Sequence, residues 1–221
     1  MINHAFLVLA GLLVYVAVTQ GLWVLLWLAA VLVAAWIVYL ASAPGAFMKR
    51  PDGTLPWYSW VLWGPLFAWQ WIGHEFVRHL TKEPVANEVG PGVWVGRRPR
   101  ADELPPGIKV VVDLCAELPA AHGVKDGRVY VTIPTLDARA PSPERIAEAV
   151  DQVIAADGPA FIHCAFGHGR SATVAAAVLI RRGQGTVDGI EKQMQAIRPK
   201  IGLNGHQRTA LAAAAKLARP A

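Results

Sequence analysis

The first 48 residues contain no Asp, Glu, Lys or Arg, and this absence of charge constrains the fold more than any other feature. Residues 5–41 form a nearly unbroken apolar run, which is longer than the ~20 residues that one transmembrane helix needs. Thr-Gln-Gly at residues 19–21 interrupts this run and predicts a tight turn. We therefore expect a transmembrane helical hairpin within residues 1–48, with helices at about 4–19 and 22–42.

A cleaved signal peptide is the alternative interpretation of this segment, because small residues stand at positions 41–43. A signal peptide, however, begins with basic residues and has a shorter apolar core. Lys49 and Arg50 follow the hairpin directly, and positive residues beside a membrane span favour the cytoplasmic side. We therefore expect an integral protein of the inner, cytoplasmic membrane. The rest of the chain lies in the cytoplasm if the next apolar segment does not cross.

A tryptophan-rich segment at residues 55–76 holds five of the nine tryptophans of the chain: Trp57, Trp60, Trp63, Trp69 and Trp71. Tryptophan prefers the headgroup level of a membrane, where its ring is buried and its N–H stays hydrated. The dipeptide at residues 64–65, Gly-Pro, is expected to break a helix midway. Residues 49–84 are therefore predicted to form an interfacial or re-entrant membrane segment and a linker. A third transmembrane helix is one alternative, and a soluble aromatic core, which the lack of charge and the neighbouring hairpin disfavour, is the other.

Residues 85–221 have the composition of an ordinary globular domain, in which strand-like and helix-like segments alternate. The patterns predict strands at 92–96, 108–115, 128–134 and 159–165, and helices at 142–156, 170–183, 186–199 and 204–218. Ser142 followed by Pro143 is typical of a helix start. Strands that alternate with helices indicate an α/β domain with a central, mostly parallel sheet flanked by helices.

The last predicted strand runs into "HCAFGHGRS", residues 163–171, where a cysteine and an arginine enclose a short loop. The loop consists of Ala165, Phe166, Gly167, His168 and Gly169. A strand, a glycine-bearing loop and a helix start turn backbone N–H groups toward one point, where they bind a phosphate-sized anion. The same groups stabilise a thiolate at Cys164, and Arg170 offers a planar fork to two phosphate oxygens. This chemistry predicts displacement at phosphorus through a cysteinyl-phosphate intermediate.

His163, Cys164, Arg170 and Ser171, in this spacing, resemble the signature of the protein-tyrosine-phosphatase superfamily, and the small apolar helix that follows resembles its dual-specificity branch. The match extends over most of residues 88–215. The resemblance implies that branch's fold and a cysteine-dependent phosphoric monoester hydrolase. It also implies that the serine donates a hydrogen bond to the sulfur and that the histidine orients the loop. No metal-ligand spacing is evident, so we expect no metal and no cofactor. A purely structural cysteine is the alternative.

The resemblance further implies a general acid, usually an aspartate on a loop after an earlier strand. Asp137 is the candidate, because it lies 27 residues before the cysteine on a loop bracketed by prolines. A simple surface aspartate is the alternative. Three other acids compete poorly, since they fall in a strand, a turn and the outer face of a helix: Asp113, Asp126 and Asp151. Arg139 is interpreted either as a substrate contact or as a solvated arginine.

The cysteine loop and the apolar N-terminal segment indicate the class of substrate. The loop contains no lysine, which favours a monoester over a multiply phosphorylated ring, and only His168 adds charge. Residues 113–119 resemble a branch that acts on phosphatidylglycerophosphate and related phospholipids. We therefore expect a membrane-anchored enzyme and a phosphorylated lipid substrate, such as phosphatidylglycerophosphate or a phosphoinositide.

Two alternatives to a lipid phosphatase stay open at this point. The first is a protein tyrosine or dual-specificity phosphatase that acts on phosphoproteins, since a membrane anchor also suits that role. The second is a catalytically silent phosphate-binding module. The net charge of +5 adds attraction to anionic lipid. Without a basic cluster it predicts no nucleic-acid partner, and the oligomeric state stays open.

The second cysteine, Cys115, ends one predicted strand as Cys164 ends another. Parallel strands end at the same edge of a sheet, so the two thiols are expected near each other. The resemblance implies that Cys115 traps the oxidised nucleophile in a reversible disulfide. A buried core thiol is the alternative.

Overall fold

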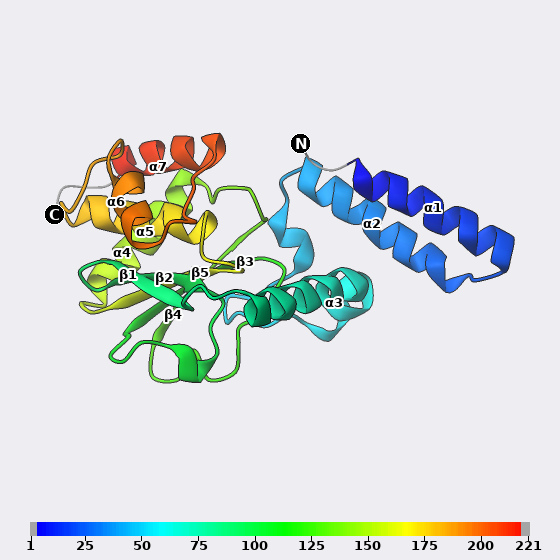
Figure 1. Cartoon of the computed structure of the whole chain (residues 1–221), viewed down its shortest axis with the longest axis horizontal. Helices are drawn as coiled ribbons and strands as arrows, with labels where there is room; N and C mark the ends of the chain where they lie inside the picture. Colours follow the sequence, from blue (N-terminus) through cyan, green and yellow to red (C-terminus); the bar gives the residue numbers. More distant parts are fainter. Residues whose placement is uncertain (1–3, 218–221) are drawn as a thin grey trace.

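The computed structural model describes residues 4–217 and contains one five-stranded sheet (Figure 1). The strands are β1 (Ala86–Gly90), β2 (Val93–Arg97), β3 (Val110–Cys115), β4 (Val129–Thr135) and β5 (Ala160–Cys164). Their order across the sheet is β1-β2-β5-β3-β4, and every neighbouring pair is parallel except β1 and β2. The predicted, mostly parallel sheet is confirmed. The sequence pattern missed β1, because this edge strand is short and carries Asn and Glu at its centre.

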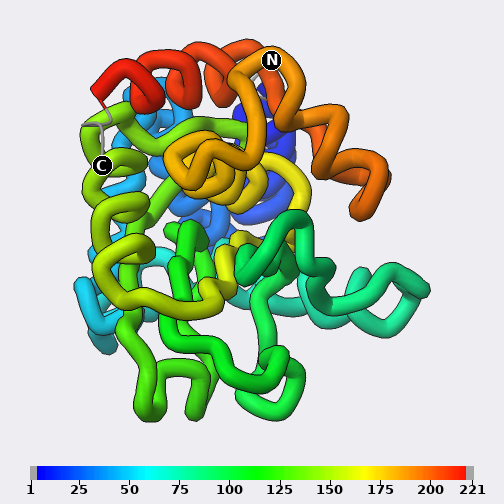
Figure 2. Tube along the Cα trace, turned by 90° about the vertical axis from the view of Figure 1, so that its left-hand side faces the viewer, coloured from blue at the N-terminus to red at the C-terminus, as the bar shows by residue number. Residues whose placement is uncertain are grey.

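Four helices cover one face of the sheet: α4 (Pro143–Ala155), α5 (Arg170–Arg181), α6 (Ile190–Ile197) and α7 (Gly205–Leu217). Figure 2 shows this helical layer, in yellow to red, above the strands drawn mainly in green. The predicted cap is confirmed, since the Ser142 hydroxyl accepts a hydrogen bond from the backbone N–H of Arg145. α6 begins later than predicted, because residues 186–189 form a turn. The predicted helix 204–218 corresponds to α7, and residue 218 lies outside the described residues.

The prediction of a transmembrane hairpin is wrong. Among residues 4–217, none of the helices combines the length and the apolar character that crossing a membrane requires. α1 (Ala5–Gln20) has 16 residues and α2 (Val24–Leu40) has 17. At 1.5 Å per residue these lengths are about 24 and 26 Å, against about 30 Å for the hydrocarbon core of a bilayer. The two helices do form a hairpin, which projects from the α/β domain (Figure 1).

The tryptophan-rich segment forms one continuous helix, α3 (Trp57–Leu80), so the break expected at Gly64-Pro65 is wrong. A proline inside a helix costs about 3 kcal/mol. Tertiary contacts on both sides of Pro65 offset this cost, because Trp63, Leu66 and Phe67 are all buried. Trp63 lies in a core rather than at a surface, and its indole N–H donates a hydrogen bond to the carbonyl of Ala46.

A hydrophobic cluster joins these N-terminal helices to the α/β domain. We call it the N-terminal cluster; its buried members are Val31, Ala35, Val38, Phe47, Trp63, Leu66, Phe67, Ala116 and Leu136. Ala116 directly follows β3, and Leu136 directly follows β4. The ends of two sheet strands therefore share a core with α2 and α3.

Lys49 adds a buried ionic contact between the two parts of the chain. Its side chain is fully buried, and the ammonium lies 2.6 Å from a carboxylate oxygen of Asp113 in β3. It also donates hydrogen bonds to the carbonyls of Cys115 and Leu118, and the Tyr130 hydroxyl donates to the same carboxylate. Lys49 therefore serves as an internal counter-ion and does not indicate membrane sidedness.

Burial alone would raise the pKa of Asp113, but the Lys49 ammonium and the hydrogen bonds from Lys49 and Tyr130 outweigh burial. The pKa of this carboxyl group is consequently held well below its usual range. Because the folded-state pKa is lowered, Asp113 stabilises the fold at pH values above its unfolded pKa of about 4. That stabilisation is lost as the pH falls further.

Replacing Lys49 by methionine leaves the Asp113 carboxylate buried without its counter-charge. We expect Lys49→Met to lower the free energy of unfolding by about 3–5 kcal/mol at neutral pH, as measured by denaturant titration. The deficit should shrink under acidic conditions, where Asp113 becomes protonated. The double variant Lys49→Met/Asp113→Asn should recover part of the loss, and Arg50→Met, at an exposed neighbouring position, is the control. Equal stability of Lys49→Met and Arg50→Met would contradict the assignment.

Candidate active site

The cysteine loop has the geometry that its sequence predicts. β5 ends at Cys164, and α5 begins at Arg170, so that the five intervening residues wrap around the sulfur. The backbone N–H of Gly167 donates to the Cys164 sulfur at 3.2 Å, and the Ser171 hydroxyl lies 3.4 Å from it. The loop opens into a cavity of about 310 Å³, which Asp137 and His168 also line.

The surroundings of Cys164 favour its thiolate. Burial by itself would raise the pKa of the thiol. The Arg170 guanidinium, the Ser171 hydroxyl and backbone N–H, and the Gly167 N–H outweigh burial, so the pKa is lowered. A thiolate that is held by hydrogen-bond donors at the start of a helix is a competent nucleophile.

Arg170 is almost fully buried and held in place from two strands. Its two terminal nitrogens donate to the Glu117 carboxylate at 3.0 and 2.8 Å, and Nη1 also donates to the carbonyl of Thr135 at 2.8 Å. Within the described part of the chain, its Nε–H has no hydrogen-bond partner. A buried, unpaired donor on a residue that lines the same cavity as Cys164 indicates an anion site there.

Glu117 is a functional residue that the sequence reasoning missed. It lies on the segment that follows β3, and its side chain is as buried as that of Arg170. The available signal was an acidic residue between apolar neighbours, since a carboxylate is rarely buried without a cationic partner. Its partner stands 53 positions away, so the sequence alone did not identify the pair.

Asp137 lines the cavity, and its side chain is 61% exposed; its role as the general acid stays a prediction. One of its carboxylate oxygens is 3.2 Å from Nη2 of Arg170. Among the described residues that line this cavity it is the sole acid. The competing Asp113 is buried beneath Lys49, and Asp151 pairs with Arg181 on the helical layer.

His168 does not add a free positive charge to the loop. Its Nε2 lies 2.9 Å from a carboxylate oxygen of Glu83, which also contacts Arg198 and Lys200. Burial lowers the pKa of His168, although Glu83 opposes that effect. Arg198 in turn donates to the carbonyl oxygens of Gly167 and Phe166 and so supports the loop from outside. The support by Glu83 and Arg198 was not predicted.

His163 and Cys115 lie on the side of β5 and β3 where Lys49 binds Asp113. Burial lowers the pKa of His163 to about 4, so its ring is neutral. Asp113 pairs with His163 in the sheet, which confirms that β3 and β5 end at the same edge.

The ligand atoms of Asp113, Cys115 and His163 lie within 4.8 Å of one another, as those of a metal site would. However, the Lys49 ammonium already neutralises the Asp113 carboxylate. Burial raises the pKa of Cys115 well above its usual value. The loop-orienting role of His163 and the redox role of Cys115 stay predictions.

Gly167 is required for the loop to close. Its φ is +78°, and a Cβ atom there would lie 2.4 Å from the carbonyl carbon of Gly96 in β2. Gly167→Ala must therefore displace the loop or strain it by roughly 1–3 kcal/mol. We expect it to weaken the binding of inorganic phosphate by about 10- to 100-fold, as measured by calorimetry. Gly73→Ala, which adds a methyl group where nothing lies within 4 Å, is the control. Unchanged phosphate affinity in Gly167→Ala would contradict the anion site.

Comparisons with known proteins agree with this geometry. A family model described as "Polymorphic toxin system, DSP-PTPase phosphatase" matches residues 101–184. The solved structure of Tk-PTP in its active form is 26% identical, covers 60% of this chain and 97% of its own, and has a TM-score of 0.53. A search of curated proteins found no match.

Two further solved structures share the fold. PTPMT1 in complex with PI(5)P is 19% identical, covers 60% of this chain and 96% of its own, and has a TM-score of 0.52. Human DUSP28 is also 19% identical, covers 59% of this chain and 96% of its own, and has a TM-score of 0.51.

The cysteine loop lies within the residues that match the family model. Residues 101–184 thus match a dual-specificity phosphatase model, and this match identifies the chain as a cysteine-dependent phosphoric monoester hydrolase.

Proposed function

We propose that Cys164 is the nucleophile, Arg170 the phosphate ligand and Asp137 the general acid of this phosphatase. The lowered pKa of Cys164, in a cavity that Arg170 also lines with an Nε–H that is unpaired among the described residues, is the observation that carries the proposal. A phosphate group in the cavity would accept hydrogen bonds from that Nε–H and from the N–H groups of the loop. Its phosphorus would then face the sulfur.

The reaction proceeds in two displacements at phosphorus. In the first, the thiolate attacks, an S–P bond forms, and the bond from phosphorus to the ester oxygen breaks. Asp137, at the mouth of the cavity, gives its proton to the departing oxygen. In the second, water attacks the cysteinyl-phosphate, gives its proton to the Asp137 carboxylate, and releases inorganic phosphate. Ser171, 3.4 Å from the sulfur, stabilises the thiolate as it leaves.

Cys164→Ser should abolish turnover of para-nitrophenyl phosphate and keep phosphate affinity within a few-fold. A serine hydroxyl is not ionised at neutral pH, whereas the loop and Arg170 are unchanged. Arg170→Lys should lose both turnover and phosphate affinity, because a point charge does not reproduce the planar fork. Release of phosphate by purified Cys164→Ser at a rate comparable to the wild-type rate would refute the covalent mechanism.

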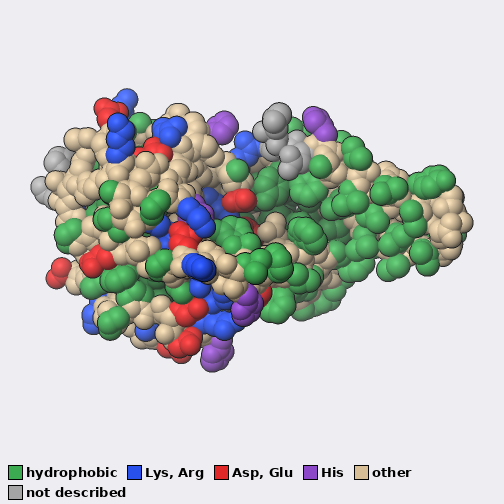
Figure 3. Space-filling view, viewed as in Figure 1, with side chains coloured by type: hydrophobic (Ala, Val, Ile, Leu, Met, Phe, Trp, Pro, Cys, Tyr) green, Lys and Arg blue, Asp and Glu red, His purple; other side chains and the backbone are tan. Residues whose placement is uncertain are grey.

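We further propose that the substrate is a phosphorylated lipid, such as phosphatidylglycerophosphate or a monophosphorylated phosphoinositide, presented at a membrane surface. Large apolar side chains are exposed along α1, α2 and α3, among them Val8, Tyr15, Trp23, Trp57 and Trp69. Figure 3 shows the hydrophobic side chains spread over the hairpin, where Lys, Arg, Asp and Glu are absent from residues 4–48. Monomeric proteins rarely expose so large an apolar surface to water.

Two features of the site support a lipid monoester in particular. The loop has no lysine, and His168, whose pKa is lowered by burial, is paired with Glu83, so the loop itself offers little positive charge to a second phosphate group. The similar fold of PTPMT1 has been solved with PI(5)P, a lipid that bears one monoester phosphate on its ring. Contact of the helical hairpin with lipid would raise the local concentration of headgroups around the cavity.

A vesicle experiment separates lipid from protein substrates. The enzyme should release phosphate from phosphatidylglycerophosphate in phosphatidylcholine vesicles at least ten times faster than from a phosphotyrosine peptide. The variant Trp57→Ala/Trp69→Ala should lose vesicle binding and lipid turnover but keep para-nitrophenyl phosphate turnover, since neither residue lines the cavity. A faster rate on the peptide than on the lipid would favour the phosphoprotein alternative.

A further inference from the structure

We propose that the carboxyl end of α2 positions the loop that carries Asp137, through Arg139 and Tyr39. This inference rests on the proposed role of Asp137 as general acid. In this proposal, Arg139 and Tyr39 are positioning residues. They hold the Asp137 side chain over the cavity and do not contact the substrate themselves. The helical hairpin, and not only the α/β domain, thereby takes part in the protonation step.

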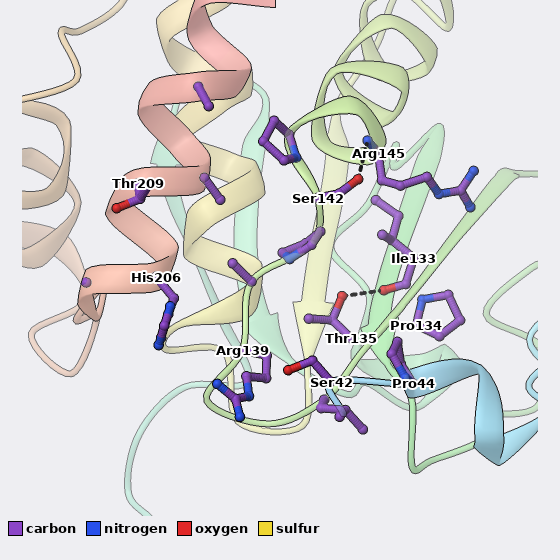
Figure 4. A pocket seen from close by; sticks show the side chains of 17 residues that line it. Ser42, Pro44, Ile133, Pro134, Thr135, Arg139, Ser142, Arg145, His206 and Thr209 are labelled. Atoms are coloured by element: carbon purple, nitrogen blue, oxygen red, sulfur yellow. Dashed lines mark hydrogen bonds between the residues drawn. The ribbon is translucent and has the colours of Figure 1, made fainter. Parts of the chain in front are cut away.

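Arg139 connects the acid loop to α2 across 100 positions of sequence. Its Nη2 donates to the carbonyl of Tyr39 at 2.9 Å, so Arg139 is not simply a solvated arginine, and the substrate contact stays a prediction. The last carbonyls of a helix lack partners within the helix and form the negative end of its dipole. A guanidinium group is the complementary cap for such an end. Figure 4 shows Arg139 beside Ser42, which lies just after the end of α2.

The Tyr39 ring lies against the site itself. Burial raises the pKa of its phenol, the carboxylates of Glu117 and Asp137 raise it further, and Arg170 opposes them. The phenol is therefore close to the carboxylates of Glu117 and Asp137 and to the backbone of Asp137. Tyr39 thus meets the acid loop at two points, through its carbonyl, which accepts from Arg139, and through its phenol, which lies near Asp137.

The acid loop needs such tethers, because open space lies on both of its sides. The cavity of about 310 Å³ is on one side, and a groove of about 1020 Å³ on the other, between the loop, the start of α7 and the end of α2 (Figure 4). Within the loop, Ala138 has a φ of +58°, which a non-glycine residue adopts only when its surroundings enforce it.

Contacts from the other side complete the tethering. Asn204 donates to the carbonyl of Ala138 at 2.8 Å, and Gln207 donates to the carbonyl of Arg139 at 3.1 Å. Leu136 is buried in the N-terminal cluster. The loop is thus held by α7 from one side and by α2 from the other, and removing the α2 contacts releases the half that carries Asp137.

The test compares substrates that differ in their need for a proton. An alkyl phosphate, such as glycerol phosphate, requires protonation of its leaving oxygen, whereas para-nitrophenyl phosphate requires little. We expect Arg139→Met and Tyr39→Phe to lower kcat for the alkyl ester by about 10- to 100-fold, in line with the cost of a misplaced group. The aryl ester should lose less than about three-fold, and KM should change little for either ester. Arg139→Lys, which retains a cation at the helix end, should recover part of the loss.

Controls separate this inference from folding and from the proposed function. Arg145→Met, at the same groove but paired with Glu148, should leave both rates unchanged. Tyr39→Phe removes only a hydroxyl group, so it serves if Arg139→Met fails to fold. Asp137→Asn should show the same substrate selectivity at about 100-fold or more. If Asp137→Asn loses more activity on the alkyl ester than on the aryl ester but Arg139→Met and Tyr39→Phe do not, the positioning role alone is refuted. Absence of selectivity in Asp137→Asn would refute both that role and Asp137 as the acid.

Discussion

The ion pair between Arg170 and Glu117 is the interaction on which the site depends. Both side chains are 98% buried, and the pair joins the start of α5 to the segment after β3. Removing one partner of such a pair strands a buried charge, at a cost of about 3–5 kcal/mol. The pair engages the two terminal nitrogens of the arginine and leaves its Nε–H without a partner among the described residues. Under the proposed mechanism, Glu117 would therefore orient the phosphate ligand as much as the loop does.

The charges around the cavity are arranged in compensated pairs, and the loop itself carries little spare charge. Glu117 neutralises Arg170, and Glu83 faces His168, Arg198 and Lys200. What is left for an incoming phosphate is mainly the backbone N–H groups and one guanidinium N–H. Such a site binds through directed hydrogen bonds more than through net charge, which favours a small, singly phosphorylated group.

The parts of the site that could be predicted are those encoded within a few residues. The loop from Cys164 to Arg170 is local in sequence, and the strand before it and the helix after it have clear patterns. Asp137 became the candidate acid because the family resemblance implies an aspartate on a loop after an earlier strand, and this role stays a prediction. Glu117, Glu83 and Lys49 were not assigned their partners, because these charges meet residues 53 to 85 positions away. The packing of the sheet brings such pairs together, and the periodicity of apolar residues along the sequence does not predict this packing.

The N-terminal helices show the opposite limitation, since their composition was misleading. An uncharged run over residues 5–41 indicated a membrane span, yet the turn after Gln20 divides it into helices that are too short. Gly64-Pro65 indicated a helix break, yet the burial of Trp63 and Phe67 holds α3 together. In α3, tertiary packing outweighed a local preference of about 3 kcal/mol, whereas in the hairpin the turn was expected and the lengths of the helices were not.

The N-terminal cluster has a consequence for how this protein can change over evolution. Domains that are joined by flexible linkers can be shuffled, because each part brings its own complete core. Here Ala116 and Leu136 are buried by α2 and α3, and Asp113 is neutralised by Lys49. A recombination event that exchanged the first 84 residues would have to supply a matching lysine and matching aromatic residues at once. Exchange of either part alone would therefore leave buried residues of the other part without their partners.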